Sequence, residues 1–277
     1  MLQLDKTRIA IRERAYVDIL DLALRVIRVH AGPLVLAFAA GVAPMLLLNG
    51  WLLAGYAELD FEWTFPFVYP FYMVLLIFLE APLATAPATL YLGKATFTDR
   101  PEPREILREF RESLPQLLIY QGLLGVWHFR WTYLNEVILL DRNPMRRRAA
   151  GGVSTLERSR VLHKVQNVDT ASRSLPALIV GGTLFIAIWA SIFIVRGMLL
   201  GQWGLVGFLW ALFSGQWEWS FLKPMFTFYF QLSIWIVVCY FTVVRFLTYL
   251  DLRIRREGWE VELWMRAERA RLVRHWK

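Results

Sequence analysis

Residues 175–200, LPALIVGGTLFIAIWASIFIVRGMLL, decide the fold class of this chain. The stretch carries a single charged residue, Arg196, and its length matches the roughly 20 helical residues that cross a hydrocarbon core. Three further apolar stretches occupy about 33–55, 67–93 and 224–248. The sequence therefore predicts an all-α, polytopic integral membrane helical bundle with four full spans.

The composition agrees with a membrane location. Of the 277 residues, 57% are hydrophobic and only 19% are charged, and the mean hydropathy is +0.41. A soluble chain could not cover so much apolar surface. The net charge is +8, but the basic residues lie at the ends of apolar runs, and the basic loop 142–173 has no interleaved aromatic residues. This pattern indicates a membrane protein and no nucleic-acid partner.

The distribution of basic residues predicts the orientation. All but three of the 31 Lys and Arg residues fall in four segments that the predicted spans place on the same side of the membrane. These segments are 1–32, 94–114, 142–174 and the chain from Arg245 onward. Because positive residues concentrate on the cytoplasmic side, both termini are predicted to be cytoplasmic. The membrane domain, 33–248, then lies between an amphipathic helix in 1–32 and a cytoplasmic helix in 249–277.

Residues 115–141 are apolar at both ends and polar in the middle. Both flanks are basic, so the segment must enter and leave the membrane on one side. Two full spans need roughly 40 residues, which this segment does not have. It is predicted to be a re-entrant helical hairpin or two half-spans.

Polar residues inside apolar segments are the first candidates for a site. Glu80 lies in the middle of the second span, where a carboxylate is costly unless it is paired or hydrated. It could bind a proton, a cation or a basic group, or form a structural pair with Arg130. His128, Arg130, Asn135 and Glu136 interrupt 115–141 and could line a polar cavity for a lipid headgroup or another anion. Alternatively, they lie at the interface among headgroups.

Charged residues on the predicted cytoplasmic side are candidates for docking an anionic lipid or a protein partner. They are Arg146, Arg147, Arg148, Arg158, Arg160, Asp251, Arg253, Arg255, Arg256, Glu257 and Gly258, which is included as a helix breaker. The alternatives are plain topological anchoring for the loop and packing for the tail. No catalytic, metal-binding or cofactor-binding motif is found in the sequence. The single cysteine, Cys239, lies in an apolar run and excludes an intramolecular disulfide.

Three short motifs carry a resemblance to a known group of proteins. Residues 249–260 resemble a Y-x-D-x-R-x-R-x-E-G signature, 135–141 resemble a P-E-V-I-L-L-E segment without its proline, and 158–163 resemble an R-S-x-x-L segment. The chain is thus similar to bacterial membrane proteins related to the membrane domain of glycerophosphoryl diester phosphodiesterases. The resemblance implies a multi-pass protein of the bacterial inner membrane. No phosphodiesterase domain accompanies it, so that activity is not implied.

The leading functional hypothesis is a non-enzymatic component that scaffolds or anchors an inner-membrane complex, with a protein partner or a homo-oligomer. The alternative is a transporter or lipid-handling permease that uses Glu80, Arg130 and Glu136 in a polar cavity. Against this alternative, no inverted repeat is visible. An intramembrane enzyme is a third class, without motif support.

Overall fold

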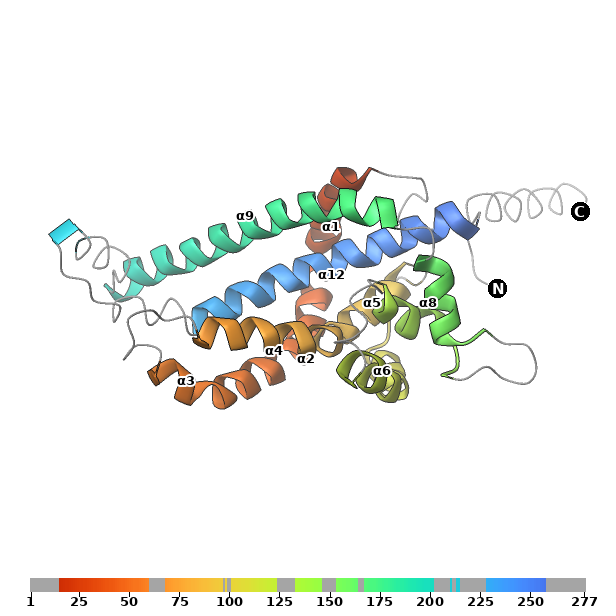
Figure 1. Ribbon diagram of the computed structural model, residues 1–277, viewed down its shortest axis with the longest axis horizontal. Coiled ribbons are helices and arrows are strands. Elements are labelled where there is room, and N and C mark those ends of the chain that lie inside the picture. Colours follow the sequence, from red (N-terminus) through yellow and green to blue (C-terminus); the bar gives the residue numbers. More distant parts are fainter. Residues whose placement is uncertain are drawn as a thin grey trace, which may run out of the picture. The chain divides into compact units, whose positions relative to one another are not determined.

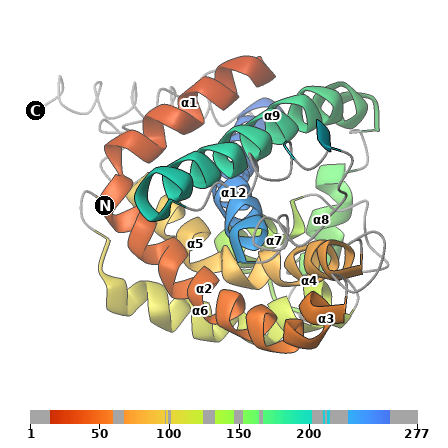
Figure 2. The same ribbon diagram turned by 90° about the vertical axis from the view of Figure 1, so that its left-hand side faces the viewer.

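The computed structural model describes residues 15–59, 68–96, 98, 101–123, 133–145, 153–163, 167–201, 210, 213–214 and 228–257. Every regular element among them is a helix (Figures 1 and 2). The helices are α1 (Tyr16–Val29), α2 (Ala31–Leu52), α3 (Ala54–Leu59), α4 (Val68–Ala84), α5 (Ala86–Ala95), α6 (Pro103–Leu117), α7 (Leu134–Glu136), α8 (Thr155–His163), α9 (Asn167–Leu200) and α12 (Phe228–Glu257). Two π-helical segments, η2 (Leu118–Leu123) and η4 (Val137–Asp141), complete the described part.

Four helical stretches among the described residues are long and apolar enough to cross a membrane. They are Ala31–Leu52, Val68–Ala95, Ser174–Leu199 and Phe228–Ile254. The predicted fold class is confirmed, and the chain is a multi-pass membrane protein. The second stretch combines α4 and α5, which are separated by a turn at Thr85. This break lies between Pro82 and Pro87, and proline removes a backbone donor and disturbs the helix before it.

The helix ends differ from the predicted span ends. The helix α9 begins at Asn167, inside the predicted loop 142–174, and α12 continues to Glu257 without a break at residue 248. Hydropathy marks where a helix becomes polar, whereas backbone hydrogen bonding continues through charged turns. The first part of the predicted C-terminal helix is therefore an extension of the last span.

The chain divides into two compact units. Unit 1 comprises Met1–Phe38, Thr85–Gln166 and Tyr240–Lys277, and unit 2 comprises Ala39–Ala84 and Asn167–Cys239. The helices α2 and α12 contribute residues to both units.

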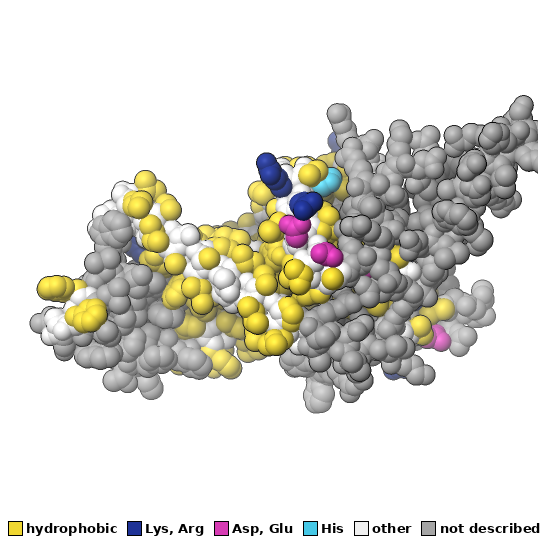
Figure 3. All heavy atoms as spheres, turned by 90° about the horizontal axis from the view of Figure 1, so that it is seen from above, with side chains coloured by type: hydrophobic (Ala, Val, Ile, Leu, Met, Phe, Trp, Pro, Cys, Tyr) yellow, Lys and Arg dark blue, Asp and Glu magenta, His cyan; other side chains and the backbone are white. Residues whose placement is uncertain are grey.

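Unit 2 is held together by an apolar core. Its buried members are Val42, Leu53, Tyr69, Met73, Ile77, Ala84 and Trp235, from α2, the turn after it, α4 and α12. Gly41 lets α2 and α4 approach closely, because a Cβ atom at this position would overlap the backbone carbonyl of Ala84. Small residues commonly mark such close helix contacts in membranes. On α9, the side chains seen from above are mostly hydrophobic (Figure 3), as expected of a span that faces lipid.

In unit 1, the two described ends of segment 115–141 pack back on each other. The helix α6 contacts both η2 and η4, and η4 also contacts α5 and α8. Tyr133, Val137, Leu162, Tyr249 and Leu252 form the buried cluster beneath them. The described ends of the segment therefore lie close together, and a hairpin that enters the membrane stays a prediction.

The helix α1 carries apolar residues on two faces. Ile19, Leu20, Ala23 and Val26 are buried, whereas Val17 and Leu24 are 67% and 54% exposed. The helix has apolar residues on more than one face, so periodicity alone does not select the face that packs. Figure 3 shows the charged side chains of this region gathered on its outer surface.

Candidate functional site

A pocket of about 230 Å³ opens in unit 1. Its walls come from α5, α6, η4 and the C-terminal part of α12, so it lies where two of the four spans end. Five lining side chains are large and apolar: Leu90, Leu139, Leu140, Phe246 and Leu250. Four are charged: Lys94, Glu109, Arg142 and Arg253. The pocket therefore combines an apolar wall with cations at the boundary of the membrane.

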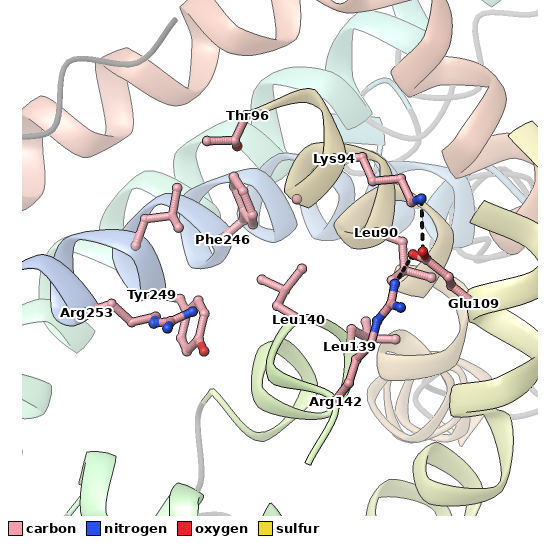
Figure 4. Close-up of a pocket in the computed structure, with 12 residues that line it drawn as sticks. Leu90, Lys94, Thr96, Glu109, Leu139, Leu140, Arg142, Phe246, Tyr249 and Arg253 are labelled. Carbon is pink, nitrogen blue, oxygen red and sulfur yellow. Dashed lines mark ion pairs between the residues drawn. The ribbon is translucent and has the colours of Figure 1, made fainter. Parts of the chain in front are cut away.

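Glu109 is the buried centre of the charged side of the pocket (Figure 4). Lys94 Nζ lies 2.9 Å from its Oε1 atom, and Arg142 pairs with its Oε2 atom. Lys94 also binds Glu105 on the surface of α6, at 2.6 Å. Burial acts to raise the pKa of the Glu109 carboxyl, but hydrogen bonds and charge from Arg142 and Lys94 outweigh it, so the pKa lies below its usual value. Glu109 is thus an anion that holds two cations together.

Arg142 has an unusual backbone conformation. Its φ of 49° and ψ of 37° place it in the left-handed region, at the end of η4. Glycine or asparagine normally occupies this position, because a larger side chain there costs roughly 1–2 kcal/mol. Hydrogen bonds fix the next residues: Thr155 Oγ1 and Gln116 Nε2 donate to the Asn143 carbonyl, at 2.9 and 3.1 Å. The fold therefore forces an arginine to turn toward the pocket.

Asp141 organises the neighbouring ion pairs. The Tyr249 hydroxyl donates to its Oδ1 atom at 2.8 Å, and Arg253 Nη1 donates to the same atom at 3.0 Å. Arg158 Nε donates to Oδ2 at 3.0 Å. The guanidinium of Arg253 also lies over the Tyr249 ring, at 5.9 Å. Asp141 therefore fixes one wall of the pocket and joins the three motifs of the predicted resemblance.

A second ion pair stabilises the same end of the unit. Glu136 is 1% exposed, and Arg245 Nη2 lies 3.0 Å from both of its carboxylate oxygens. Asn135 beside it is also 1% exposed, and its amide has no hydrogen-bond partner in the described part of the chain. Two of the predicted polar candidates thus lie in the protein interior, next to the pocket-forming η4.

The predicted docking residues divide into three groups. Asp251 is 3% exposed, so the docking interpretation is corrected for this residue. Arg158 and Arg253 bind Asp141, and Arg253 also lines the pocket, so docking through these two stays a prediction. Arg160 is exposed, and its role stays a prediction. Outside the described residues lie His128, Arg130, Arg146, Arg147, Arg148 and Gly258, together with the side chains of Arg255, Arg256 and Glu257.

Glu80 has a partner that the sequence analysis did not name. Asn49 Nδ2 donates to its Oε2 atom at 2.8 Å, within unit 2. Arg130 lies outside the described residues, so the predicted pair with it stays a prediction beside this amide contact. Each of the two acids of the predicted polar cavity, Glu80 and Glu136, therefore has its own partner.

Sequence reasoning found Arg253 but missed three charged residues of the pocket, Lys94, Glu109 and Arg142. One usable signal is the period of α6, which places Glu109 on the same face as the buried Leu117. No group of metal-ligating side chains occurs in the parts of the chain that the structure describes.

Fold and site together define a multi-pass α-helical membrane protein with a charged pocket at the ends of two spans. Comparison of the chain with protein-family models, with curated proteins and with solved structures finds no match.

Proposed function

We propose that this protein binds an anionic, phosphate-bearing lipid headgroup in the unit 1 pocket and acts as a non-enzymatic, lipid-handling membrane component. The observation that carries the proposal is the pocket itself: three cations, one carboxylate and five large apolar side chains at the ends of two spans. A volume of about 230 Å³ is below the 300–1,000 Å³ typical of pockets for drug-sized ligands. It suits a headgroup better than a complete lipid.

The chemistry of the cations supports a phosphate ligand. Arg142 gives part of its planar guanidinium to Glu109, and its side chain remains 50% exposed. Lys94 is bound to Glu105 and Glu109, and an ammonium group has a third donor. Arginine and lysine both bind phosphate through charge-assisted hydrogen bonds. The apolar wall would contact the glycerol backbone and the first acyl carbons.

The expected setting is the cytoplasmic side of a bacterial inner membrane. The pocket end carries Lys94, Arg142 and Arg253, in agreement with the positive-inside rule. Anionic lipids attract basic groups near this surface by about 1 kcal/mol each. The scaffold hypothesis stays a prediction, because it depended largely on Arg146 to Arg148 and on the tail after residue 257.

Native mass spectrometry of the full chain tests the proposal. The protein in mild detergent is titrated with phosphatidylglycerol, and with phosphatidylcholine for comparison. Arg142→Gln and Lys94→Gln are each expected to weaken phosphatidylglycerol retention about tenfold, since a charge-assisted contact contributes about 1.5 kcal/mol. The matched control is Arg108→Gln, on the exposed side of α6, where the side chain is 69% exposed. Equal retention by the control and the pocket variants would contradict the proposal.

The same titration separates two sources of phosphate. Glycerol phosphate and inorganic phosphate are added without lipid. If they compete with phosphatidylglycerol only at much higher concentration, the ligand is a lipid headgroup. If they bind as tightly as the lipid, the pocket recognises a soluble phosphate compound, and the lipid-handling function is wrong.

A further inference from the structure

A second polar site lies in unit 2, within the membrane. Glu80 is on α4, near the middle of the span Val68–Ala95, and it is half-buried. The core beside it is apolar, with Met73, Ile77 and Ala84 on the same helix. An ionised carboxylate in this environment is costly unless a cation accompanies it.

No cation accompanies Glu80 among the described residues. The unit 2 parts of α2, α4 and α12 contain no charged residue other than Glu80, and the ionisable groups in their core are Tyr69 and Cys239. The helix α3, which contains Glu58, contacts α4 near its start, where the rings of Tyr56 and Tyr72 meet. Tyr72 is eight residues before Glu80, which is about 12 Å along the helix axis. On α9, Arg196 lies over the ring of Tyr229, at 5.2 Å.

The partner of Glu80 indicates its protonation state. Asn49 is fully buried, and its Nδ2 atom donates to Glu80 Oε2. Its Oδ1 atom is also buried and has no donor in the described part of the chain. A carboxylate can only accept, but a carboxylic acid also donates through its hydroxyl. A proton on Glu80 Oε1 would supply the donor that the buried Asn49 oxygen lacks, as in a cyclic pair of an acid and an amide.

Further polar atoms are buried in the same unit. Gln231 is 0% exposed and Trp235 is 1% exposed, one turn apart on α12. The Gln231 amide and the Trp235 indole N–H have no hydrogen-bond partner among the described residues. Bound water commonly satisfies such groups, and water is also the carrier of protons to a buried acid.

We propose that Glu80 and Asn49 form an intramembrane proton-binding site, in which Glu80 exchanges its proton and the neutral acid is paired with the Asn49 amide. The site is in another unit from the headgroup pocket and shares no residue with it. A negative result for one proposal therefore leaves the other unaffected.

Infrared spectroscopy of the full chain in liposomes tests the protonated state directly. The wild type is expected to show the carbonyl band of a protonated carboxylic acid at neutral pH, and this band should be missing in Glu80→Gln. A glutamine amide can accept from Asn49 Nδ2 and donate to Asn49 Oδ1, so the variant is expected to fold. Identical spectra of the two proteins in the carbonyl region would overturn the proposal.

A membrane-soluble carbodiimide tests whether the proton exchanges. The reagent adds to a neutral carboxylic acid: the acid proton goes to a carbodiimide nitrogen, the carboxyl oxygen bonds to the central carbon, and the O-acylisourea rearranges to a stable N-acylurea without a leaving group. Peptide mass spectrometry should find Glu80 labelled, at a rate that falls as the pH rises. Glu136, paired with Arg245, is the internal control and should stay unlabelled. A labelling rate that does not change with pH, or labelling of Glu136 alone, would overturn the proposal.

Discussion

Glu136 in unit 1 and Glu80 in unit 2 are both carboxylic acids in apolar surroundings, and they have partners of opposite kinds. Glu136 is bound by the guanidinium of Arg245, whereas Glu80 receives one hydrogen bond from the amide of Asn49. A cation stabilises the ionised form, and a neutral amide contributes only about 1 kcal/mol per hydrogen bond. We infer that the first acid is a fixed anion and the second a neutral acid.

The difference extends to the two units as wholes. In unit 1, three acids, Glu109, Glu136 and Asp141, are each bound by at least one cation around the pocket. Unit 2 depends on the apolar core and on the close approach of α2 and α4 at Gly41. Charge changes should therefore affect unit 1 most, and volume changes should affect unit 2 most.

The largest expected effect comes from removing the cation beside Glu136. Arg245→Met leaves a carboxylate that is 1% exposed without its ion pair, and breaking a buried pair in this way costs about 3–5 kcal/mol. Unfolding by SDS in mixed micelles, followed by far-ultraviolet circular dichroism, measures the loss. Glu80→Gln is the matched comparison and should change the unfolding free energy by less than about 1 kcal/mol, because glutamine resembles the neutral acid. Equal losses in both variants would remove the distinction between the two acids.

The next effect tests the packing of unit 2. Gly41→Ala adds a methyl group that overlaps the Ala84 carbonyl, and overpacking of this kind costs about 1–3 kcal/mol. Gly50→Ala on the same helix is the control, because no atom lies within 4 Å of its added methyl group. The control should be neutral, or stabilising by up to about 1 kcal/mol through helix propensity. The same SDS titration compares them, and a tolerated Gly41→Ala would show that α2 and α4 do not depend on this contact.

A smaller effect should appear in acid and belongs to unit 1. The folded-state pKa of Glu109 lies below its unfolded-state value of about 4.5, so its contribution to stability is complete above pH 4.5 and is lost as the pH falls through the folded-state pKa. The contribution is on the order of 1.5 kcal/mol, that of a hydrogen bond to a charged group. Thermal unfolding of the wild type and of Glu109→Gln between pH 3 and 7 measures it. The two curves should converge in acid, and a constant difference across this range would contradict the assignment.

The spans could be predicted from sequence, because lipid contact imposes an apolar composition on the whole exposed surface of a helix. On α9, only 6% of the most apolar stretch is buried by the protein itself. The partners of the polar residues could not be predicted in this way. Asp141 binds Tyr249 and Arg253, more than 100 positions away, and no local periodicity encodes such contacts.

The contact between Asn49 and Glu80 was not predicted, although the sequence contains a signal for it. Asn49 is the one strongly polar residue of the first predicted span, 33–55, and Glu80 is the one charged residue of the second before Lys94. Two isolated polar residues in successive antiparallel spans can meet, since burying either alone in hydrocarbon is costly. Charge complementarity alone points to a cation such as Arg130, whereas this adjacency points to Asn49.

The smallest expected effect separates the backbone of Arg142 from its side chain. Arg142→Ala and Arg142→Gly both remove the ion pair with Glu109, but only glycine adopts a φ of 49° without a steric penalty. The glycine variant should therefore be more stable than the alanine variant by about 1 kcal/mol. Thermal unfolding of the two variants measures this difference. The affinity for phosphatidylglycerol should fall by the same factor in both variants. If they are equally stable, the left-handed conformation carries no strain, and the turn of Arg142 toward the pocket does not depend on its backbone.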